Sequence, residues 1–210
     1  KLITLNLLAY QGYLTDDRLL DQFSQGNLNH YRLGFVRGSI HEVEPCFRDS
    51  EIVSFDMASI RQGDSPGCVS PSPNGLYAEE ACQLARFAGL SNRNQCFGLF
   101  DLSPENDRNN QSAHLAAQIV WHYIEAFNNR KVDSISSSKN VKRFYVKSPI
   151  PNVELVFIKS ISTDKWWMEL PGTKKTEGKP FLVACTYNDY RLASKGDVPD
   201  RWLKILRMVS

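Results

Sequence analysis

The segment from Glu51 to Gly89 constrains the fold more than any other part of the chain. It begins with Ile52-Val53-Ser54-Phe55, an apolar, β-branched run between two acidic residues that is typical of a buried strand. A loop rich in Pro, Gly and Ser follows. From Tyr77 to Gly89, apolar residues recur every three or four positions, which predicts a helix with one buried face and a C-terminal stop at Gly89. A strand, a loop and a helix in this order indicate an α/β fold.

Strand and helix patterns alternate in the same way through residues 1–130. We predict strands at residues 2–8, 31–36, 51–56 and 95–102, helices at residues 39–47, 77–89 and 112–129, and a further helix start at Thr15-Asp16-Asp17. In the helix at 39–47, Ser39 and Glu42 match a capping box. Apolar strands separated by helices form mostly parallel sheets that are covered on both faces, so we expect a three-layer αβα sandwich.

The sequence changes character after Arg130. Residues 131–152 are predicted to be a polar loop. Residues 153–210 are predicted to be an appended element with strands at 154–159, 166–170 and 181–186 and short helices at 187–194 and 199–208. We expect this element to pack on the same domain as residues 1–130. Because the chain opens on what looks like an interior strand and lacks an initiating Met, residues 1–130 are expected to be the C-terminal part of a larger domain.

Charge and cysteine usage exclude several classes of function. The chain has 25 Lys and Arg against 23 Asp and Glu, and these residues are scattered, so nothing indicates binding to nucleic acid or a membrane surface. No apolar run reaches the roughly 18 residues needed to cross a bilayer. The 5 cysteines form no Cys-x-x-Cys motif and are odd in number. They are typical of reduced, buried thiols in a cytoplasmic protein.

Residues 54–80 resemble the last metal-binding motif of the arginase, agmatinase and formimidoylglutamase family, the ureohydrolases. In that family a buried strand ends in Ser-Phe-Asp-x-Asp-x-x-Asp-Pro, and Gly-Gly-Leu-Thr then leads into a helix that bears Glu. This chain has Ser-Phe-Asp-Met-Ala-Ser-Ile-Arg from Ser54, and Pro-Asn-Gly-Leu-Tyr before Ala78. The resemblance implies an arginase-like αβα fold, a site with two Mn2+ ions, and hydrolysis of C–N bonds in linear amidines.

A second match lies at residues 97–107, which resemble the family's next signature, a strand ending in Glu-x-x-Pro-x-x-Asp. Asp101 takes the place of the Glu that contacts the amidine or guanidine group of the substrate, with one methylene less. Pro104 and Asp107 match outright, and Ser112 begins a segment similar to the family's Thr-Ala-x-x-Ala helix. The resemblance covers about residues 31–128, and the chain looks most like a divergent formimidoylglutamase.

The sequence departs from the family where the metals bind. Asp56 keeps the first ligand position, but Ala58 occupies the second and Arg61 the third, and the family's Gly-Gly-Asp-His and Asp-x-His-x-Asp segments are absent. Two metal ions need several carboxylate and imidazole ligands. We therefore expect this chain to bind no Mn2+ pair. Asp56 is the single candidate metal ligand, and no catalytic residue is assigned.

Two functional hypotheses follow. The first is a catalytically degenerate, metal-deficient portion of a ureohydrolase, a pseudoenzyme with a formimidoylglutamate-like ligand. The second is a non-catalytic binding or assembly module that retains the arginase-like fold. In either case Asp101 and Arg61 are the candidate contacts for a small amidine-type ligand. Whether the protein is an enzyme at all, and whether it forms a homo-oligomer, both stay open.

The site residues also have plainer interpretations. Asp56 could cap the loop that follows its strand by accepting backbone N–H bonds. Arg61 could form an ion pair with Asp101 that replaces the lost metal charge, or it could be a solvated loop residue. Asp64 could swing in as a replacement ligand. Asn74, in place of the first Gly of the family motif, is predicted to have a positive φ.

Overall fold

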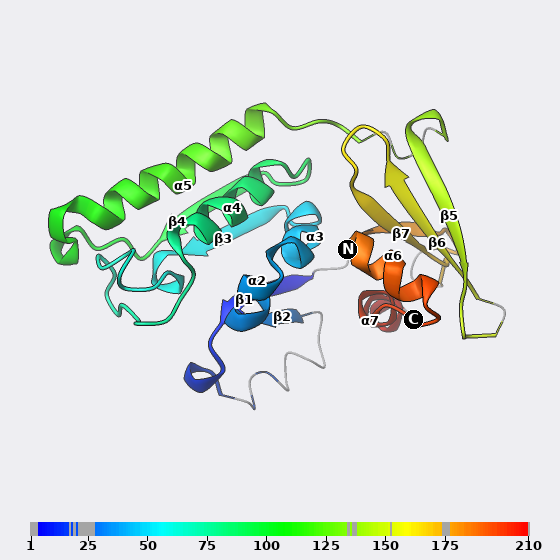
Figure 1. The fold of residues 1–210 in the computed structure, drawn as a ribbon, viewed down its shortest axis with the longest axis horizontal. Helices are drawn as coiled ribbons and strands as arrows, with labels where there is room; N and C mark the ends of the chain where they lie inside the picture. The colour runs from blue at the N-terminus through cyan, green and yellow to red at the C-terminus, as the bar shows by residue number, and fades with distance from the viewer. Residues whose placement is uncertain are drawn as a thin grey trace. The chain divides into compact units, whose positions relative to one another are not determined.

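The computed structural model describes residues 4–16, 18, 20, 28–133, 135, 138–151, 153–173 and 177–209. The chain divides into two compact units, residues 1–130 and 131–210 (Figure 1). Within the described ranges, no helix has both the length and the apolar character needed to cross a bilayer. The predicted helix start near Thr15 lies mostly outside the described residues.

The first unit alternates strands and helices. Its main elements are β1 (Leu5–Tyr10), β2 (Leu28–Arg32), α2 (Leu33–Gly38), α3 (Glu44–Arg48), β3 (Ile52–Asp56), α4 (Ala78–Gly89), β4 (Cys96–Phe100) and α5 (Gln111–Asn128). The predicted strands at 51–56 and 95–102 and the predicted helices at 77–89 and 112–129 are confirmed to within a few residues. All four strands are in parallel pairs, β1 with β2 and β3 with β4.

The predicted strand at 31–36 is wrong in both extent and position. The strand is Leu28–Arg32, it pairs with β1, and α2 begins directly after it at Leu33. Val36 is fully buried on α2 and Leu33, three residues earlier, packs against the same core. This spacing fits one face of a helix, and that face has a core to bury against.

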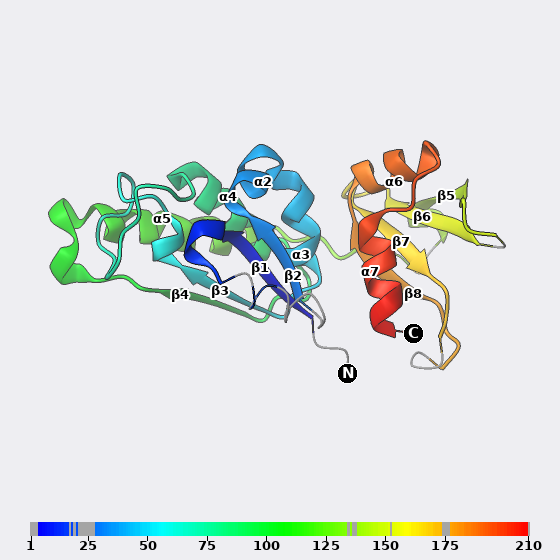
Figure 2. The ribbon, with the colours of Figure 1, turned by 90° about the horizontal axis from the view of Figure 1, so that it is seen from below.

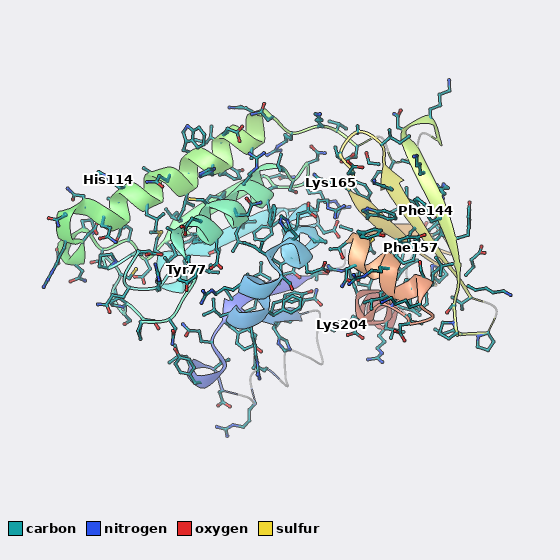
Figure 3. All side chains as sticks on the ribbon, viewed as in Figure 1. Tyr77, His114, Phe144, Phe157, Lys165 and Lys204 are labelled. Atoms are coloured by element: carbon teal, nitrogen blue, oxygen red, sulfur yellow. The ribbon has the colours of Figure 1, made fainter. Side chains whose placement is uncertain are left out.

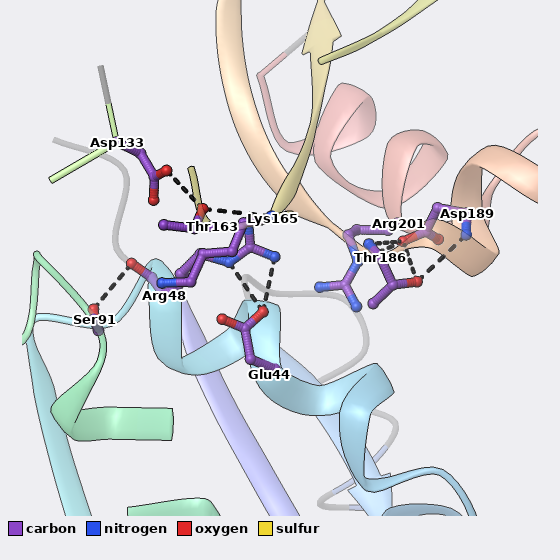
Figure 4. Close-up of polar contacts among 9 residues, drawn as sticks. All are labelled: Glu44, Arg48, Ser91, Asp133, Thr163, Lys165, Thr186, Asp189 and Arg201. Atoms are coloured by element: carbon purple, nitrogen blue, oxygen red, sulfur yellow. Dashed lines mark hydrogen bonds and ion pairs between the residues drawn. The ribbon is translucent and has the colours of Figure 1, made fainter. Parts of the chain in front are cut away.

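The helix predicted at 39–47 is two shorter segments. The Ser39 side chain makes no capping hydrogen bond, a 3-10 turn covers Ile40–Val43, and α3 follows with Pro45 in its first turn. Proline fits the first turn of a helix but breaks a helix interior, so the helix begins again at Glu44. Arg48, at the end of α3, forms an ion pair with Glu44 at 2.8 Å (Figure 4).

One hydrophobic core holds the first unit together. Val53, Phe55, Phe97 and Leu99 point from β3 and β4 into it, on the side of the sheet where α4 and α5 lie (Figure 2). The Phe97 ring stacks on Tyr123 of α5, with centroids 4.6 Å apart. The structure confirms an α/β unit with parallel strands, but in the described residues the strands form separate pairs rather than one sheet.

Gly89 has a different role from the predicted one. It lies inside α4, and the residue after it, Leu90, is right-handed, so the helix does not end on a left-handed glycine. A Cβ at Gly89 would lie 2.4 Å from the Tyr123 carbonyl oxygen and 2.7 Å from the Ala126 Cβ. Glycine is therefore required here by the close approach of α4 and α5.

The second unit is an antiparallel sheet with two helices. Its elements are β5 (Val141–Lys147), β6 (Glu154–Ser160), β7 (Trp166–Leu170), β8 (Phe181–Cys185), α6 (Tyr187–Ser194) and α7 (Asp200–Val209), and the strands lie in sequence order. Most of these elements lie where the sequence predicts them. β5 does not, because it occupies part of the range predicted as a loop, residues 131–152. Its inward side chains, Phe144 and Val146, alternate with exposed ones, as expected for a strand. The polar residues around them make this alternation hard to recognise in the sequence.

Aromatic side chains fill the core between the sheet and the helices of this unit. Phe144 and Phe157 reach into it from β5 and β6 (Figure 3), and Trp166 stacks on Tyr190 of α6 at 5.0 Å. Trp166 and Trp167 lie on opposite faces of β7, as neighbouring residues of a strand must. The Thr186 hydroxyl accepts the Asp189 N–H, and the Asp189 carboxylate accepts the Thr186 N–H, a capping box that begins α6 (Figure 4).

Candidate functional site

The candidate site lies at the carboxyl ends of the parallel strands β3 and β4. Asp56 is the last residue of β3, and Asp101 is the first residue after β4. Asp56 pairs with Phe100 in the register, and Asp101 comes directly after that strand. The loop from Met57 to Tyr77 covers this end. It is joined to itself by backbone hydrogen bonds, from Arg61 N–H to the Leu76 carbonyl at 3.1 Å and from Leu76 N–H to Ser59 at 2.9 Å. These hydrogen bonds hold the two ends of the loop together beside the site.

Asp56 serves as a cap in this structure. Its carboxylate accepts the Ala58 N–H at 2.8 Å, which begins the 3-10 turn Met57–Ser59. The capping interpretation of Asp56 is thus confirmed. Ala58, at the second ligand position of the family motif, presents a methyl group with no lone pair.

Arg61 pairs with Asp64 rather than with Asp101. Both guanidinium contacts to the Asp64 carboxylate are 2.9 Å, a two-pronged ion pair of good geometry. The same carboxylate accepts the Ala78 N–H at 3.0 Å at the start of α4. The structure therefore does not contain the hypothesised ion pair between Arg61 and Asp101. The guanidinium of Arg61 is paired instead with Asp64, an acid three residues away in the same loop.

Electrostatics follow this pairing. The hydrogen bonds from Arg61 lower the pKa of Asp64, partial burial opposes this, and the Ala78 N–H lowers it further. The Asp64 hydrogen bond in turn raises the pKa of Arg61. Both groups are thus held in their charged forms at neutral pH.

Tyr77 lies at the junction of the loop and α4 (Figure 3) and has guanidinium groups over its ring. The Arg61 Cζ is 4.2 Å from the ring centroid and the Arg37 Cζ is 3.9 Å from it. Arg37 also reaches Glu80 at 3.4 Å, and Glu80 accepts the Tyr77 N–H at 2.8 Å. These contacts fix the loop onto the first turn of α4. Tyr77 is not among the site residues predicted from the sequence, and Asp64 is predicted only as a replacement metal ligand. The Arg-x-x-Asp spacing is a usable signal for the pairing of Arg61 with Asp64.

Asp101 is less constrained by its contacts than Asp56. Its backbone is left-handed, with a φ of 57°, and its carboxylate accepts one long hydrogen bond of 3.4 Å from the Val69 N–H. A left-handed non-glycine residue at the end of a strand stores backbone strain of about 1 kcal/mol. By contrast, Asn74 is absent from the positive-φ residues of the described chain, so that prediction is wrong.

The buried thiol of Cys68 lies in the loop at this end of the strands. Burial raises the pKa of Cys68, a hydrogen bond with the Ser65 side chain opposes this, and the negative charges of Asp101, Asp56 and Asp107 add to the rise, in that order. Asp56 ends β3 and Asp101 follows the neighbouring strand β4, so the two residues stand at the same end of one parallel pair. Asp107 is used structurally, since its carboxylate accepts the Ser112 and Ala113 N–H groups at 2.8 and 2.9 Å and caps α5. Within the described ranges, no three His, Cys, Asp or Glu side chains are placed to hold a metal ion.

The Asp64 cap yields a prediction for the site loop. Asp64→Ala removes the ion pair and the Ala78 cap, and we expect it to lower the free energy of unfolding of the first unit by roughly 1–2 kcal/mol at pH 7. Asp64→Asn keeps an acceptor for Ala78 and should cost less than half as much, because Arg61 is 42% exposed and its ion pair is screened. Denaturant unfolding, followed by hydrogen exchange of α4 peptides, measures the free energy of unfolding of both variants.

The pH dependence of the same variants has a defined sign. The folded pKa of Asp64 is lowered, so its contribution is fully present above the unfolded value of about 3.9 and is lost as pH falls through the folded value. The gap between the parent and Asp64→Ala should therefore narrow below about pH 4. A gap that stays constant from pH 7 to the acid limit would contradict this assignment.

Comparisons with known proteins show which proteins the first unit is similar to. A family model described as Arginase family matches residues 27–125. Formimidoylglutamase of Bacillus subtilis is 22% identical over 128 residues, covering 57% of this chain and 37% of that protein. Formimidoylglutamase of Staphylococcus haemolyticus is 25% identical over 95 residues, covering 40% of this chain and 30% of that protein. The chain thus spans about a third of the length of the curated relatives it matches.

Solved structures show the same fold relationship. A crystal structure of Trypanosoma cruzi formiminoglutamase with Mn2+ matches with a TM-score of 0.56 at 23% identity, covering 60% of this chain and 45% of that one. Arginase from Bacillus caldovelox matches with a TM-score of 0.50 at 16% identity, covering 60% of this chain and 43% of that one. The resemblance of residues 31–128 to the arginase family is confirmed by the family model, and the solved structures confirm it at the level of fold.

Proposed function

Because residues 27–125 are an arginase-family segment related to formimidoylglutamases, we propose that the first unit is the C-terminal portion of an arginase-type αβα domain that has lost hydrolytic chemistry. The observation that carries this proposal is the state of the metal motif. The Asp56 carboxylate is used to cap Ala58, and Ala58 has no ligand atom. A hydrolase acting on linear amidines through a metal pair would need both positions.

The Mn2+ pair that the family implies does not fit the residues of this chain. Arg61, at the third position of the motif, brings a positive charge that is held in place by Asp64 at 2.9 Å. A cation in this loop opposes the binding of dications close to it. We therefore derive no metal-dependent step and propose that this chain contributes fold and surface rather than catalysis, as a pseudoenzyme.

Binding of a small amidine-type ligand is a second candidate function. Asp101 supports it, because its carboxylate is only partly buried and has one long hydrogen bond, so it is accessible to a cationic amidine group. Arg61 is not included in this proposed contact, since it faces Asp64. We also propose a cytoplasmic location, which the 5 free cysteines support.

A Mn2+ titration tests the main proposal. We expect no tightly bound Mn2+ by electron paramagnetic resonance of the free ion, with the Trypanosoma cruzi protein as the positive control. Ala58→Asp alone should not create a stoichiometric site, because a two-metal site needs several further ligands. Stoichiometric Mn2+ binding that is lost in the isosteric variant Asp56→Asn would overturn the proposal.

A further inference from the structure

The two units of the chain carry opposite net charge. Residues 1–130 contain ten Lys and Arg against fifteen Asp and Glu, whereas residues 131–210 contain fifteen Lys and Arg against eight Asp and Glu. The near-neutral balance of the whole chain, which argued against binding to nucleic acid, hides this division. A strongly basic unit attracts polyanions, and the arrangement of its charges and aromatic rings determines which kind it binds.

An exposed tyrosine lies against the aromatic core of the second unit. Tyr187, the first residue of α6, is 58% exposed. Its ring centroid is 5.5 Å from that of Trp166 and 5.9 Å from that of Tyr190. The tyrosine ring is therefore held by packed aromatic neighbours while more than half of the residue is in contact with solvent. A ring held in this way can stack on a further flat ring.

Two lysines lie beside this aromatic cluster. Lys142 and Lys159 are directly opposite each other in the register of β5 and β6. They are on the face of the sheet that carries Phe144 and Phe157, because side chains two positions apart in a strand point the same way. The Lys159 Nζ is 5.8 Å from the ring centroid of Trp166. The lysine pair and the exposed tyrosine thus belong to one region of this face.

The nearby acid does not balance the bases of this region. Asp164 is 2.6 Å from the Lys159 Nζ, but it is 79% exposed, so this ion pair is screened by solvent. A hydrogen bond from Lys159 lowers the pKa of Asp164 most, the charge of Lys159 adds to this, burial opposes it, and the charge of Lys142 lowers the pKa further. Arg191, which is also exposed, follows Tyr187 by one helical turn on the same side of α6. Three bases therefore accompany one acid.

The opposite face of the same sheet has an exposed tyrosine without this excess of charge. Tyr145 of β5 is 61% exposed. Arg143, two residues before it, forms an ion pair with Glu169 at 3.3 Å. Lys147, two residues after it, is directly opposite Glu154 in the register. Bases and acids thus balance around Tyr145, which makes it a matched control for Tyr187.

We propose that one surface of the second unit binds single-stranded nucleic acid, with a base stacked on Tyr187 and phosphates at the neighbouring cations. We call it the basic tyrosine surface, and its residues are Lys142, Lys159, Tyr187 and Arg191. Stacking on an aromatic side chain requires an unpaired base, which favours a single strand over a duplex. The positive charge of the whole unit favours a polymer over a mononucleotide, because each further phosphate contact releases counterions. This inference goes beyond the proposed function, which concerns the first unit.

Fluorescence anisotropy of a labelled oligothymidylate of about 20 nucleotides, titrated with the full chain, tests the proposal. We expect a Kd on the order of 10 µM at about 50 mM salt. Raising the salt concentration to about 200 mM should weaken binding about 20-fold, because three phosphate contacts to a single strand give a slope near −2 for log K against log salt.

Two matched pairs of variants separate the basic tyrosine surface from general electrostatic attraction. Tyr187→Ala should weaken binding of the oligothymidylate about fivefold or more and leave binding of a duplex unchanged, whereas Tyr145→Ala should change neither. Lys142→Ala should weaken binding about fivefold and reduce the salt slope by about 0.7. Lys147→Ala removes an equal charge from the same strand and should change the affinity less than about twofold.

Four results would count against the proposal. Absence of binding at about 50 mM salt would refute it, and equal losses in Lys142→Ala and Lys147→Ala would show that net charge alone attracts the strand. Equal losses of single-strand and duplex binding in Tyr187→Ala would rule out stacking. Binding to phosphatidylserine vesicles, without binding to the oligothymidylate, would identify an anionic membrane as the ligand instead. If hydrogen exchange of β7 peptides shows that Tyr187→Ala is unfolded, the pair of lysine variants decides.

Discussion

Replacing Gly89 with alanine is expected to lower the free energy of unfolding of the first unit by about 1–3 kcal/mol, although alanine is the better helix former. The added Cβ would lie 2.4 Å from the backbone oxygen of Tyr123 and 2.7 Å from the Cβ of Ala126. Neither atom belongs to a flexible side-chain end, so α4 and α5 must move apart to admit it. That separation loosens the packing of the two longest helices over β3 and β4.

Gly34→Ala is the matched control. Gly34 is also a helical glycine, in α2, and a Cβ there would meet nothing within 4 Å. This variant should be neutral or more stable by up to about 1 kcal/mol. Denaturant unfolding read by hydrogen exchange of α4 and α5 peptides separates the two variants. Equal effects at both positions would show that the helix crossing has room for a methyl group.

Replacing Trp202 with alanine is expected to cost the second unit roughly 3–5 kcal/mol. Trp202 is 2% exposed and is the largest fully buried side chain of the described protein, in the core between α7 and the sheet. Its indole N–H has no hydrogen-bond partner in the described structure. The expected loss of stability therefore comes from lost packing contacts and from the cavity left behind. No hydrogen-bond acceptor of the described residues would lose its partner.

Trp121→Ala provides the control of the same residue type. Trp121 lies on α5 and is 61% exposed, so we expect a change within about 0.5 kcal/mol. Hydrogen exchange of β7 peptides reports the second unit and that of α4 peptides reports the first. A Trp202→Ala protein whose β7 protection matches the parent would show that α7 does not contribute to this core.

The sequence predicted the local elements well where their pattern is strong. β3 is a β-branched apolar run between acidic residues and α4 repeats apolar residues every three or four positions, and both were located to within a residue or two. The prediction failed at residues 31–36 and 39–47, where short apolar runs are ambiguous. There the decision came from tertiary contacts, such as the full burial of Val36 on α2.

For the candidate site, too, one part was predictable from the sequence and another was not. Asp56, Asp101 and Arg61 were identified from the motif, and the structure places both acids at the carboxyl ends of the paired strands β3 and β4. The partner of Arg61 was not predictable from charge alone, because Asp64 and Asp101 are both acids within reach of a loop. The geometry of the turn before α4 selects Asp64, since its carboxylate can then also accept the Ala78 N–H.

By itself the sequence determined the resemblance to the arginase family and the lack of a ligand atom at position 58, because no fold can provide a lone pair to the methyl group of Ala58. It also determined the strand and helix segments whose periodicity is local. Only the tertiary structure decided which strands pair, that Gly89 is needed for a helix crossing, and that Ile52 and Phe100 are exposed. These features depend on contacts between residues far apart in the chain, and a local pattern of side chains carries little information about such contacts.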